Sequence, residues 1–411
     1  MKGVLVIMDG LGDLPHDKLN GMTPLEAAET PNLDFLATRG EMGYMDSVKP
    51  NFVPESDEAI VCIFGNDLIS STRGQLEARG AGLKLTRGDL ALRVNFATIK
   101  GKEIIDRRAG RNLTTDEAEI LSRALNEIKL PCKFEFVPTV QHRGVLVLRG
   151  GFSDDFSGND LTYVKGKAEN VSNIGNCKPF NDEDNARYTT NILNEFLEKA
   201  HEVLINHPVN RERREKGFLP ANYLFVRGGG IEVPKLKQYK KWISITNMPL
   251  EMGFSHLSGM NVFELEYPRL KNFDAYENMH NALAKICKFS IKVIKKNLKS
   301  ADYVYLHIKE TDLPGHDNKP FEKKQMIEYV DKTLFKFLRK IAPPKEIKVV
   351  VTADHSTPCK MKAHSADPVP VLYYNNGEVP EVKQFSEKEA RKGRLGRITG
   401  KALLKKVGFA K

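Results

Sequence analysis

The stretch "VVVTADHSTPCKMKAHSADPVPVLYY" (residues 349–374) begins as an apolar, β-branched run, ends that run in Asp354 and His355, and reaches a second histidine, His364, nine residues later. An apolar run of this length predicts a buried strand. In parallel α/β sheets, ligands bind where the strands end. The stretch therefore predicts an α/β fold with a site at the carboxyl end of this strand.

Two other runs end in the same way. The run "KGVLVIMDG" (residues 2–10) leads into Asp9, and "YVYLHIKE" (residues 303–310) is followed by Asp312 and His316. Helical patterns lie between the runs, which is typical of a doubly wound, mostly parallel sheet. The Pro-Gly pair between Asp312 and His316 favours a loop there rather than a helix.

The three strand ends gather three carboxylates and three imidazoles. Like charges at this density repel one another unless cations separate them, so we expect two divalent metal ions. One metal is expected to take Asp312, His316 and His364, and the other Asp9, Asp354 and His355. Mixed histidine and carboxylate ligands suit manganese or zinc better than calcium, and a two-metal cluster is typical of phosphoryl transfer. Taken singly, each residue has another explanation, such as a turn acid or a helix cap.

A nucleophile for such a centre is offered by "FVPESDEAIVCIFGNDL" (residues 52–68), where Ser56 precedes an apolar run of helical character. Backbone N–H groups at a helix N-terminus favour an anion, and a bound metal lowers the pKa of a hydroxyl group. The alternative is that Ser56 only caps the helix.

Basic groups gather in the middle of the chain. The segment "DRRAGR" (residues 106–111) contains Arg107, Arg108 and Arg111, and His142 and Arg143 lie on a neighbouring predicted strand. Guanidinium groups grip phosphate and carboxylate in bidentate fashion. One interpretation is a basic cleft for a small polyanion, and the other is a surface ion-pair network.

The length of the chain, 411 residues, predicts a second domain. Residues 92–110 alternate around a Lys-Gly turn, residues 114–129 form a capped helical pattern, and residues 134–150 suggest two strands. We expect a discontinuous core of residues 1–91 and 186–411, with a smaller α+β domain of residues 92–185 inserted into it. Residues 151–185 have a loop-like composition, and a helix at 183–205 is expected to return the chain to the core.

Composition disfavours several classes of protein. The contents of 41% hydrophobic and 28% charged residues are ordinary for a soluble globular protein, and no apolar run has the length of a membrane span, so we expect a cytoplasmic protein. Much of the lysine behind the formal charge of +10 lies in amphipathic segments. Because no zinc finger or RNP-like strand is present, no nucleic-acid partner is expected. Five scattered cysteines are expected to be reduced.

Together these residues resemble the archaeal-type, cofactor-independent phosphoglycerate mutases of the alkaline phosphatase superfamily. The resemblance covers nearly the whole chain and is carried by stretches such as "VLVIMDGLGD", "FVPTVQHRGVLVLRGG", "HIKETDLPGHD" and "TADHSTPCKMKAHSADPVP". It implies an alkaline-phosphatase-like fold and the interconversion of 3-phosphoglycerate and 2-phosphoglycerate through a phosphoserine, without 2,3-bisphosphoglycerate. Ser56 matches the family's nucleophile and joins Asp9, Asp354 and His355 at one metal.

The resemblance also implies the partners of the enzyme. The metals are expected to be Mn²⁺, with Mg²⁺, Zn²⁺ or Co²⁺ as alternatives, and the substrate to be phosphoglycerate, held by the insert in a cleft that excludes water. The number of subunits stays open, a homo-oligomer included. The alternative hypothesis is a metal-dependent phosphatase or phosphotransferase acting on another small phosphorylated metabolite. A third hypothesis is a binding protein without turnover.

The chain departs from the family pattern at the nucleophile. The family usually has glycine before a Ser-Asp-Thr-Ala-His sequence, whereas this chain has Glu55 before Ser56, and then Asp57, Glu58, Ala59 and Ile60. The acids at positions 55 and 58 are expected to repel a phosphorylated substrate unless they point away or pair with a cation.

Overall fold

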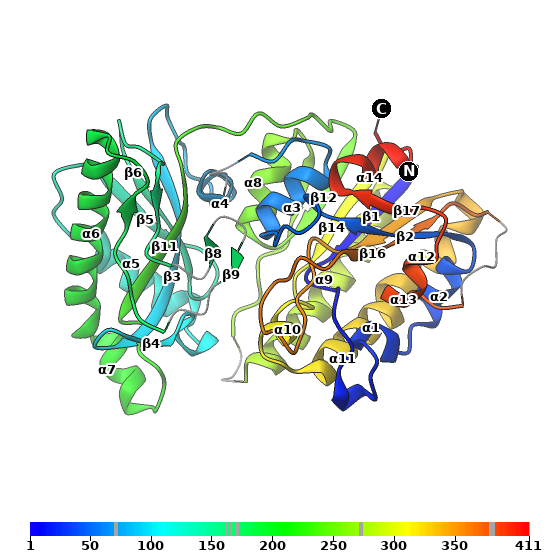
Figure 1. Cartoon of the computed structure of the whole chain (residues 1–411), viewed down its shortest axis with the longest axis horizontal. Coiled ribbons are helices and arrows are strands. Elements are labelled where there is room, and N and C mark those ends of the chain that lie inside the picture. The colour runs from blue at the N-terminus through cyan, green and yellow to red at the C-terminus, as the bar shows by residue number, and fades with distance from the viewer. Residues whose placement is uncertain are drawn as a thin grey trace.

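The chain folds around two main sheets, which lie side by side and are packed with helices (Figure 1). The computed structural model describes residues 1–69, 73–160, 172–270, 274–377 and 383–410, and the backbone of residues 163–164 and 167–168. Within the described residues, no helix is long and apolar enough to cross a membrane.

The larger sheet has eight strands in the order β13-β12-β14-β1-β15-β16-β2-β17. Its central strands β14, β1 and β15 are parallel, and β16 runs antiparallel to both of its neighbours. Every residue of β1 is buried, as expected for a strand that helices cover on both faces. The strands are β1 (Gly3–Met8), β2 (Gly40–Asp46), β12 (Trp242–Thr246), β13 (Asn261–Glu264), β14 (Tyr303–Ile308), β15 (Lys348–Thr352), β16 (Val369–Tyr374) and β17 (Gly396–Thr399).

Helices cover both faces of this sheet, so the predicted doubly wound α/β architecture is confirmed (Figure 1). One layer contains α1 (Pro24–Ala27), α2 (Pro31–Ala37), α9 (Ala275–Asn297), α11 (Pro320–Val330), α12 (Lys336–Ile341) and α13 (Glu387–Ala390). The other contains α3 (Ser56–Ile63), α8 (Pro249–Leu257) and α14 (Gly400–Lys406). The three runs that the sequence indicated as strands are β1, β14 and β15, and they are neighbours in the sheet.

The smaller sheet has five antiparallel strands in the order β11-β3-β6-β5, with β4 paired to β3. These are β3 (Leu90–Lys100), β4 (Glu103–Asp106), β5 (Phe134–Pro138), β6 (Arg143–Leu148) and β11 (Tyr223–Gly230). They pack with α5 (Thr115–Asn126) and α6 (Asp184–Ile205), and α7 (Pro208–Glu215) packs on α5. The hairpin, helix and strand pair predicted between residues 92 and 150 are all present.

Packing around the smaller sheet involves residues beyond the predicted insert of residues 92–185. Helix α6 contributes Leu193, Phe196 and Ala200 to the same apolar core as β3 and β6, and β11 pairs with β3. A helix with this apolar face is buried against the smaller sheet and does not return the chain to the larger one. We therefore propose that the inserted unit comprises residues 90–230, in place of residues 92–185. Residues 156–157 and 178–179, within the expected loop, form the short strands β7 and β10.

Helix α4 (Arg73–Gly80) lies between the two units and packs on β3, β11 and α8. Its two glycines allow this close packing. A Cβ at Gly74 would lie 1.9 Å from the carbonyl oxygen of Ala91, and one at Gly80 would lie 1.8 Å from the carbonyl oxygen of Pro249. Any larger residue at these positions would push the units apart. The glycines therefore determine the position of Arg73, the first residue of α4.

Candidate active site and metal centre

The predicted ligands come together at the carboxyl edge of the three central strands. Asp9 follows β1, Asp312 follows β14, and Asp354 and His355 follow β15. Gly10 N–H donates to Asp354 Oδ1 at 3.1 Å, which ties the end of β1 to the end of β15. The parallel strands therefore deliver side chains that are far apart in sequence to one place.

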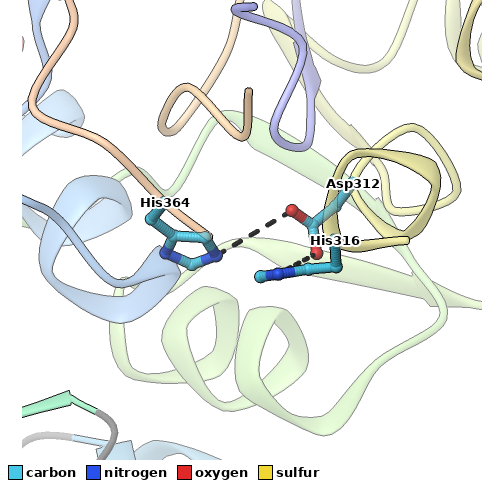
Figure 2. A group of neighbouring side chains, drawn as sticks. All are labelled: Asp312, His316 and His364. Carbon is cyan, nitrogen blue, oxygen red and sulfur yellow. Dashed lines mark ion pairs between the residues drawn. The ribbon is translucent and has the colours of Figure 1, made fainter. Parts of the chain in front are cut away.

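The first group contains Asp312, His316 and His364 (Figure 2). His316 Nε2 lies 3.2 Å from Asp312 Oδ2, and His364 Nε2 lies 3.8 Å from Asp312 Oδ1. The opposite ring nitrogens face backbone carbonyls, Nδ1 of His316 that of Lys362 at 3.1 Å and Nδ1 of His364 that of Pro54 at 2.9 Å. Because Nδ1 must carry the proton to donate to a carbonyl, each Nε2 presents its lone pair to the centre, as a metal ligand must.

A single helical turn, α10 (Leu313–His316), places His316 over Asp312, where the sequence indicated a loop. That expectation was wrong because Pro314 occupies the first turn, where its missing N–H costs no hydrogen bond. Gly315 is required by packing, since a Cβ there would lie 2.3 Å from the carbonyl oxygen of Thr357.

The second group contains Asp9, Asp354 and His355. His355 Nε2 lies 3.3 Å from Asp9 Oδ1 and 3.4 Å from Asp354 Oδ2. Thr357 Oγ1 donates to Asp312 Oδ1 at 2.7 Å, so it can only accept from His355 Nδ1, which lies 3.0 Å away. Thr357 thereby fixes the tautomer of His355 and links the two groups.

His307 of β14 also lies at this centre. Its Nε2 lies 3.6 Å from Asp9 Oδ2 and 3.6 Å from Asp354 Oδ2, and the three side chains form a further candidate metal group. Lys309, two residues on, forms an ion pair with Asp9 and lies 3.0 Å from Glu251 Oε1. Side chains alternate between the two faces of a strand, so residues 307 and 309 point to the same side. This spacing is visible in the sequence.

The residues present fit divalent cations. Among the described side chains, Asp9 Oδ1, Asp354 Oδ2 and His307 Nε2 are buried without a hydrogen-bond partner, which is costly unless another group engages them. Burial opposes ionisation of Asp312 and Asp354, but the imidazoles, those of His316 and His355 foremost, hold the pKa of each carboxyl well below its usual range. Burial and then His355 lower the pKa of His364 to about 3, so its ring is neutral and able to bind a metal.

Ser56 is the first residue of α3, and its Oγ lies 3.3 Å from His355 Nε2. Glu55 occupies the N-cap position, so Ser56 is not the residue that caps the helix. The hydroxyl instead points to the metal groups from a helix of eight residues, whose N-terminus favours an anion.

A cavity joins these groups to the second unit. Ser56, Asp9, Asp312, His316 and His364 line one part of it. The arginines that line it are Arg73, Arg93, Arg108, Arg111, Arg143 and Arg227.

Arg107, in contrast, is not among the described residues that line the cavity. Its guanidinium group pairs with Asp160 at 2.5 Å and lies over the ring of Phe225. Arg111 lines the cavity and also forms an ion pair with Asp317, which comes from the larger unit. The predicted basic segment is therefore divided: Arg108 and Arg111 line the cavity, whereas Arg107 pairs with Asp160.

His142 is buried, and neither of its ring nitrogens has a partner among the described residues. Burial, and then the charge of Arg143, hold the pKa of His142 well below its usual range. The ring is therefore neutral and offers one donor and one acceptor to whatever enters the cavity.

The acids at positions 55 and 58, near Ser56, each have a partner. Glu58 accepts the backbone N–H of Glu55 at 2.9 Å, and burial followed by the charge of Asp57 raises the pKa of Glu58 to about 8. Glu55 is ion-paired with Arg73 and Arg227. Burial opposes its ionisation, but Arg227 and Arg73 outweigh this and hold the pKa of Glu55 below its usual range.

Comparisons with known sequences all point to one family. A family model described as 2,3-bisphosphoglycerate-independent phosphoglycerate mutase matches residues 37–210. Curated proteins of that description align with almost the whole chain: 40% identity over 408 residues for Pyrococcus abyssi (97% of this chain, 95% of the relative) and 41% over 410 residues for Thermococcus kodakarensis (97% and 94%). Mutase 1 of Archaeoglobus fulgidus is 41% identical over 424 residues (98% and 96%).

Solved structures agree with the sequence comparison. A protein of Pyrococcus horikoshii superposes with a TM-score of 0.75 at 31% identity, covering 100% of this chain and 98% of its own. A cofactor-independent phosphoglycerate mutase of Thermoplasma acidophilum superposes with a TM-score of 0.54 at 29% identity, covering 98% of each chain.

Proposed function

Because the chain belongs to the 2,3-bisphosphoglycerate-independent phosphoglycerate mutases, we propose that it interconverts 3-phosphoglycerate and 2-phosphoglycerate through a phosphorylated Ser56. The observation that carries this proposal is the position of the Ser56 hydroxyl. It lies at the N-terminus of α3, beside His355, and lines a cavity that also contains arginines of the inserted unit. These are the requirements for receiving a phosphoryl group from an anionic substrate.

In the forward step, Ser56 Oγ gives up its proton and forms a bond to phosphorus while the bond between phosphorus and the C3 oxygen of the glycerate breaks, and the C3 oxygen takes up one proton. The glycerate then turns within the cavity. Its C2 hydroxyl gives up its proton and attacks the phosphorus of the phosphoserine, the bond between phosphorus and Ser56 Oγ breaks, and Ser56 Oγ takes up one proton. No net oxidation or hydrolysis occurs. Lys309 and the cavity arginines stabilise negative charge on the transferring group, so catalysis relies on positioning and electrostatics.

We assign the metal ligands as predicted from the sequence. Asp312, His316 and His364 would hold one ion, and Asp9, Ser56, Asp354 and His355 would hold the other. When bound, the ions would supply Lewis-acid stabilisation of the phosphoryl oxygens and lower the pKa of the serine hydroxyl. Mn²⁺ fits this ligand set, with Mg²⁺, Zn²⁺ and Co²⁺ as alternatives.

The substrate binds in the part of the cavity that the inserted unit forms. Arg108, Arg111 and Arg143 supply guanidinium groups for the carboxylate and phosphate, and neutral His142 supplies a donor and an acceptor for a hydroxyl group. Closure of the cavity between the two units would keep water from the phosphoserine, which distinguishes a mutase from a phosphatase.

Phosphorus NMR of 3-phosphoglycerate with manganese-loaded protein tests the proposal directly. Wild type is expected to generate 2-phosphoglycerate, and Ser56→Ala is expected to generate none while still binding substrate. Inorganic phosphate as the only product would instead identify a phosphatase. Turnover by Ser56→Ala at the wild-type rate would show that Ser56 is not the nucleophile.

A further inference from the structure

Glu55 lies directly before the nucleophile and is held in the substrate cavity by two arginines. Its Oε2 lies 2.5 Å from Arg73 Nη1, and its Oε1 lies 3.3 Å from Arg227 Nη1. Its side chain is 17% exposed. Both carboxylate oxygens are therefore committed to guanidinium groups that line the same cavity as Ser56.

These contacts belong to a larger cluster in which acids and arginines balance. Arg73 also contacts Asp57 at 3.1 Å and Glu77 at 2.9 Å, and Glu77 lies 3.5 Å from Arg93. The cluster, which we call the counter-ion cluster, consists of Glu55, Asp57, Glu77, Arg73, Arg93 and Arg227. With equal numbers of carboxylates and guanidinium groups, it presents little net positive charge to an incoming anion.

We propose that Glu55 is an internal counter-ion that occupies an anion subsite formed by Arg73 and Arg227, and that it sets the affinity of the enzyme for phosphorylated substrate. The inference rests on the proposed function, since it places the phosphorylated substrate in this cavity. A phosphate or carboxylate that uses these arginines must displace the Glu55 carboxylate and loses the energy of the contacts that it breaks. Glu55 thus weakens substrate binding and leaves the chemical step intact.

The cluster tolerates loss of this charge. Arg73 keeps two carboxylates, Asp57 and Glu77, and a glutamine at position 55 retains the shape and an oxygen acceptor. The backbone N–H of residue 55 still donates to Glu58. Glu55→Gln is therefore expected to fold normally and to change only how strongly Arg73 and Arg227 are engaged.

The test compares KM and kcat for 3-phosphoglycerate in manganese-loaded wild type and Glu55→Gln. It also compares the Kd of inorganic phosphate for the metal-free proteins by calorimetry. Both KM and the phosphate Kd are expected to fall about tenfold in the variant, the equivalent of one released charge-assisted hydrogen bond, with kcat changed much less. A merely structural role would not tighten binding.

Two further variants separate the local contact from a general charge effect. Glu135→Gln removes a carboxylate that pairs with Arg149 outside the cavity, and it is expected to leave KM and the phosphate Kd unchanged. In an Arg227→Met background, Glu55→Gln is expected to lose part of its gain, because one of the two contacts that it releases is absent while the contact with Arg73 remains.

The proposal is overturned if Glu55→Gln leaves the phosphate Kd unchanged or raises it, or if the gain is the same without Arg227. Its failure is distinct from failure of the proposed function. Tighter phosphate binding by Glu55→Gln in a protein that does not interconvert phosphoglycerates would support the counter-ion and refute the mutase chemistry.

Discussion

Replacing Lys323 by methionine is predicted to destabilise the core by about 3 kcal/mol, although Lys323 lies outside the cavity. The side chain is fully buried in α11. Its Nζ donates to Asp13 Oδ2 at 2.8 Å, to the carbonyl of Thr357 at 3.0 Å and to the carbonyl of Gly12 at 3.2 Å. One ammonium group thus satisfies three buried acceptors.

The magnitude follows from what the variant leaves behind. Removing one partner of a buried ion pair costs about 3–5 kcal/mol because the other charge stays buried. Asp13 still accepts the N–H of Cys359 at 3.0 Å and that of Leu14 at 2.8 Å, which places the cost near the lower end of this range. Lys324, the next residue, is the matched control, because its pair with Glu328 is partly exposed and one helical turn away. Lys324→Met is expected to cost only about 0.5 kcal/mol.

Urea unfolding of the metal-free proteins, followed by fluorescence, measures the difference. The single tryptophan, Trp242, lies in β12 and reports the larger unit. A loss below about 1 kcal/mol for Lys323→Met, or an equal loss for Lys324→Met, would contradict the assignment of a buried ion pair. Adding Asp13→Asn to Lys323→Met is expected to recover part of the loss, because it removes the charge left without its partner.

Two further predictions concern the same region. Burial raises the pKa of Glu387 to about 7, so the stability it contributes is fully present below its unfolded pKa of 4.5 and is lost as the pH rises through 7. Between pH 5 and pH 8, the free energy of unfolding of wild type should fall by about 2 kcal/mol relative to that of Glu387→Gln, a value reduced because the side chain is partly exposed. Parallel pH profiles of the two proteins would exclude this. Thr357→Val removes the hydroxyl that engages Asp312 and His355, and manganese titration should show about 10-fold to 100-fold weaker binding. Thr352→Val, whose hydroxyl donates to a carbonyl between strands, should bind manganese normally, and equal affinities for both variants would refute the role of Thr357.

The strand ends were predictable because they depend on a local signal. A buried strand requires a continuous apolar run, and the first polar residues after it must lie at the edge of the sheet. Asp9, Asp312 and Asp354 could therefore be placed together before the order of the strands was known. His307 does not show this signal, because it lies inside the apolar run, where a buried histidine is ordinary and only the structure shows which residues it contacts.

The extent of the inserted unit was not predictable in the same way. The amphipathic pattern of α6 shows that one face is buried but does not show which sheet buries it. The strand β11 also has the composition of either sheet, and only its antiparallel pairing with β3 assigns it to the smaller one.

The counter-ion cluster could not be predicted from the sequence. Arg73 begins α4, Arg93 lies on β3 and Arg227 lies on β11, and no motif joins them. They come together with Glu55 and Glu77 because α4 is packed closely between the two units, as Gly74 and Gly80 permit. The metal groups are built within one sheet, whereas the cluster exists only where the units meet. A small shift between the units would therefore change anion affinity before it disturbs the metal ligands.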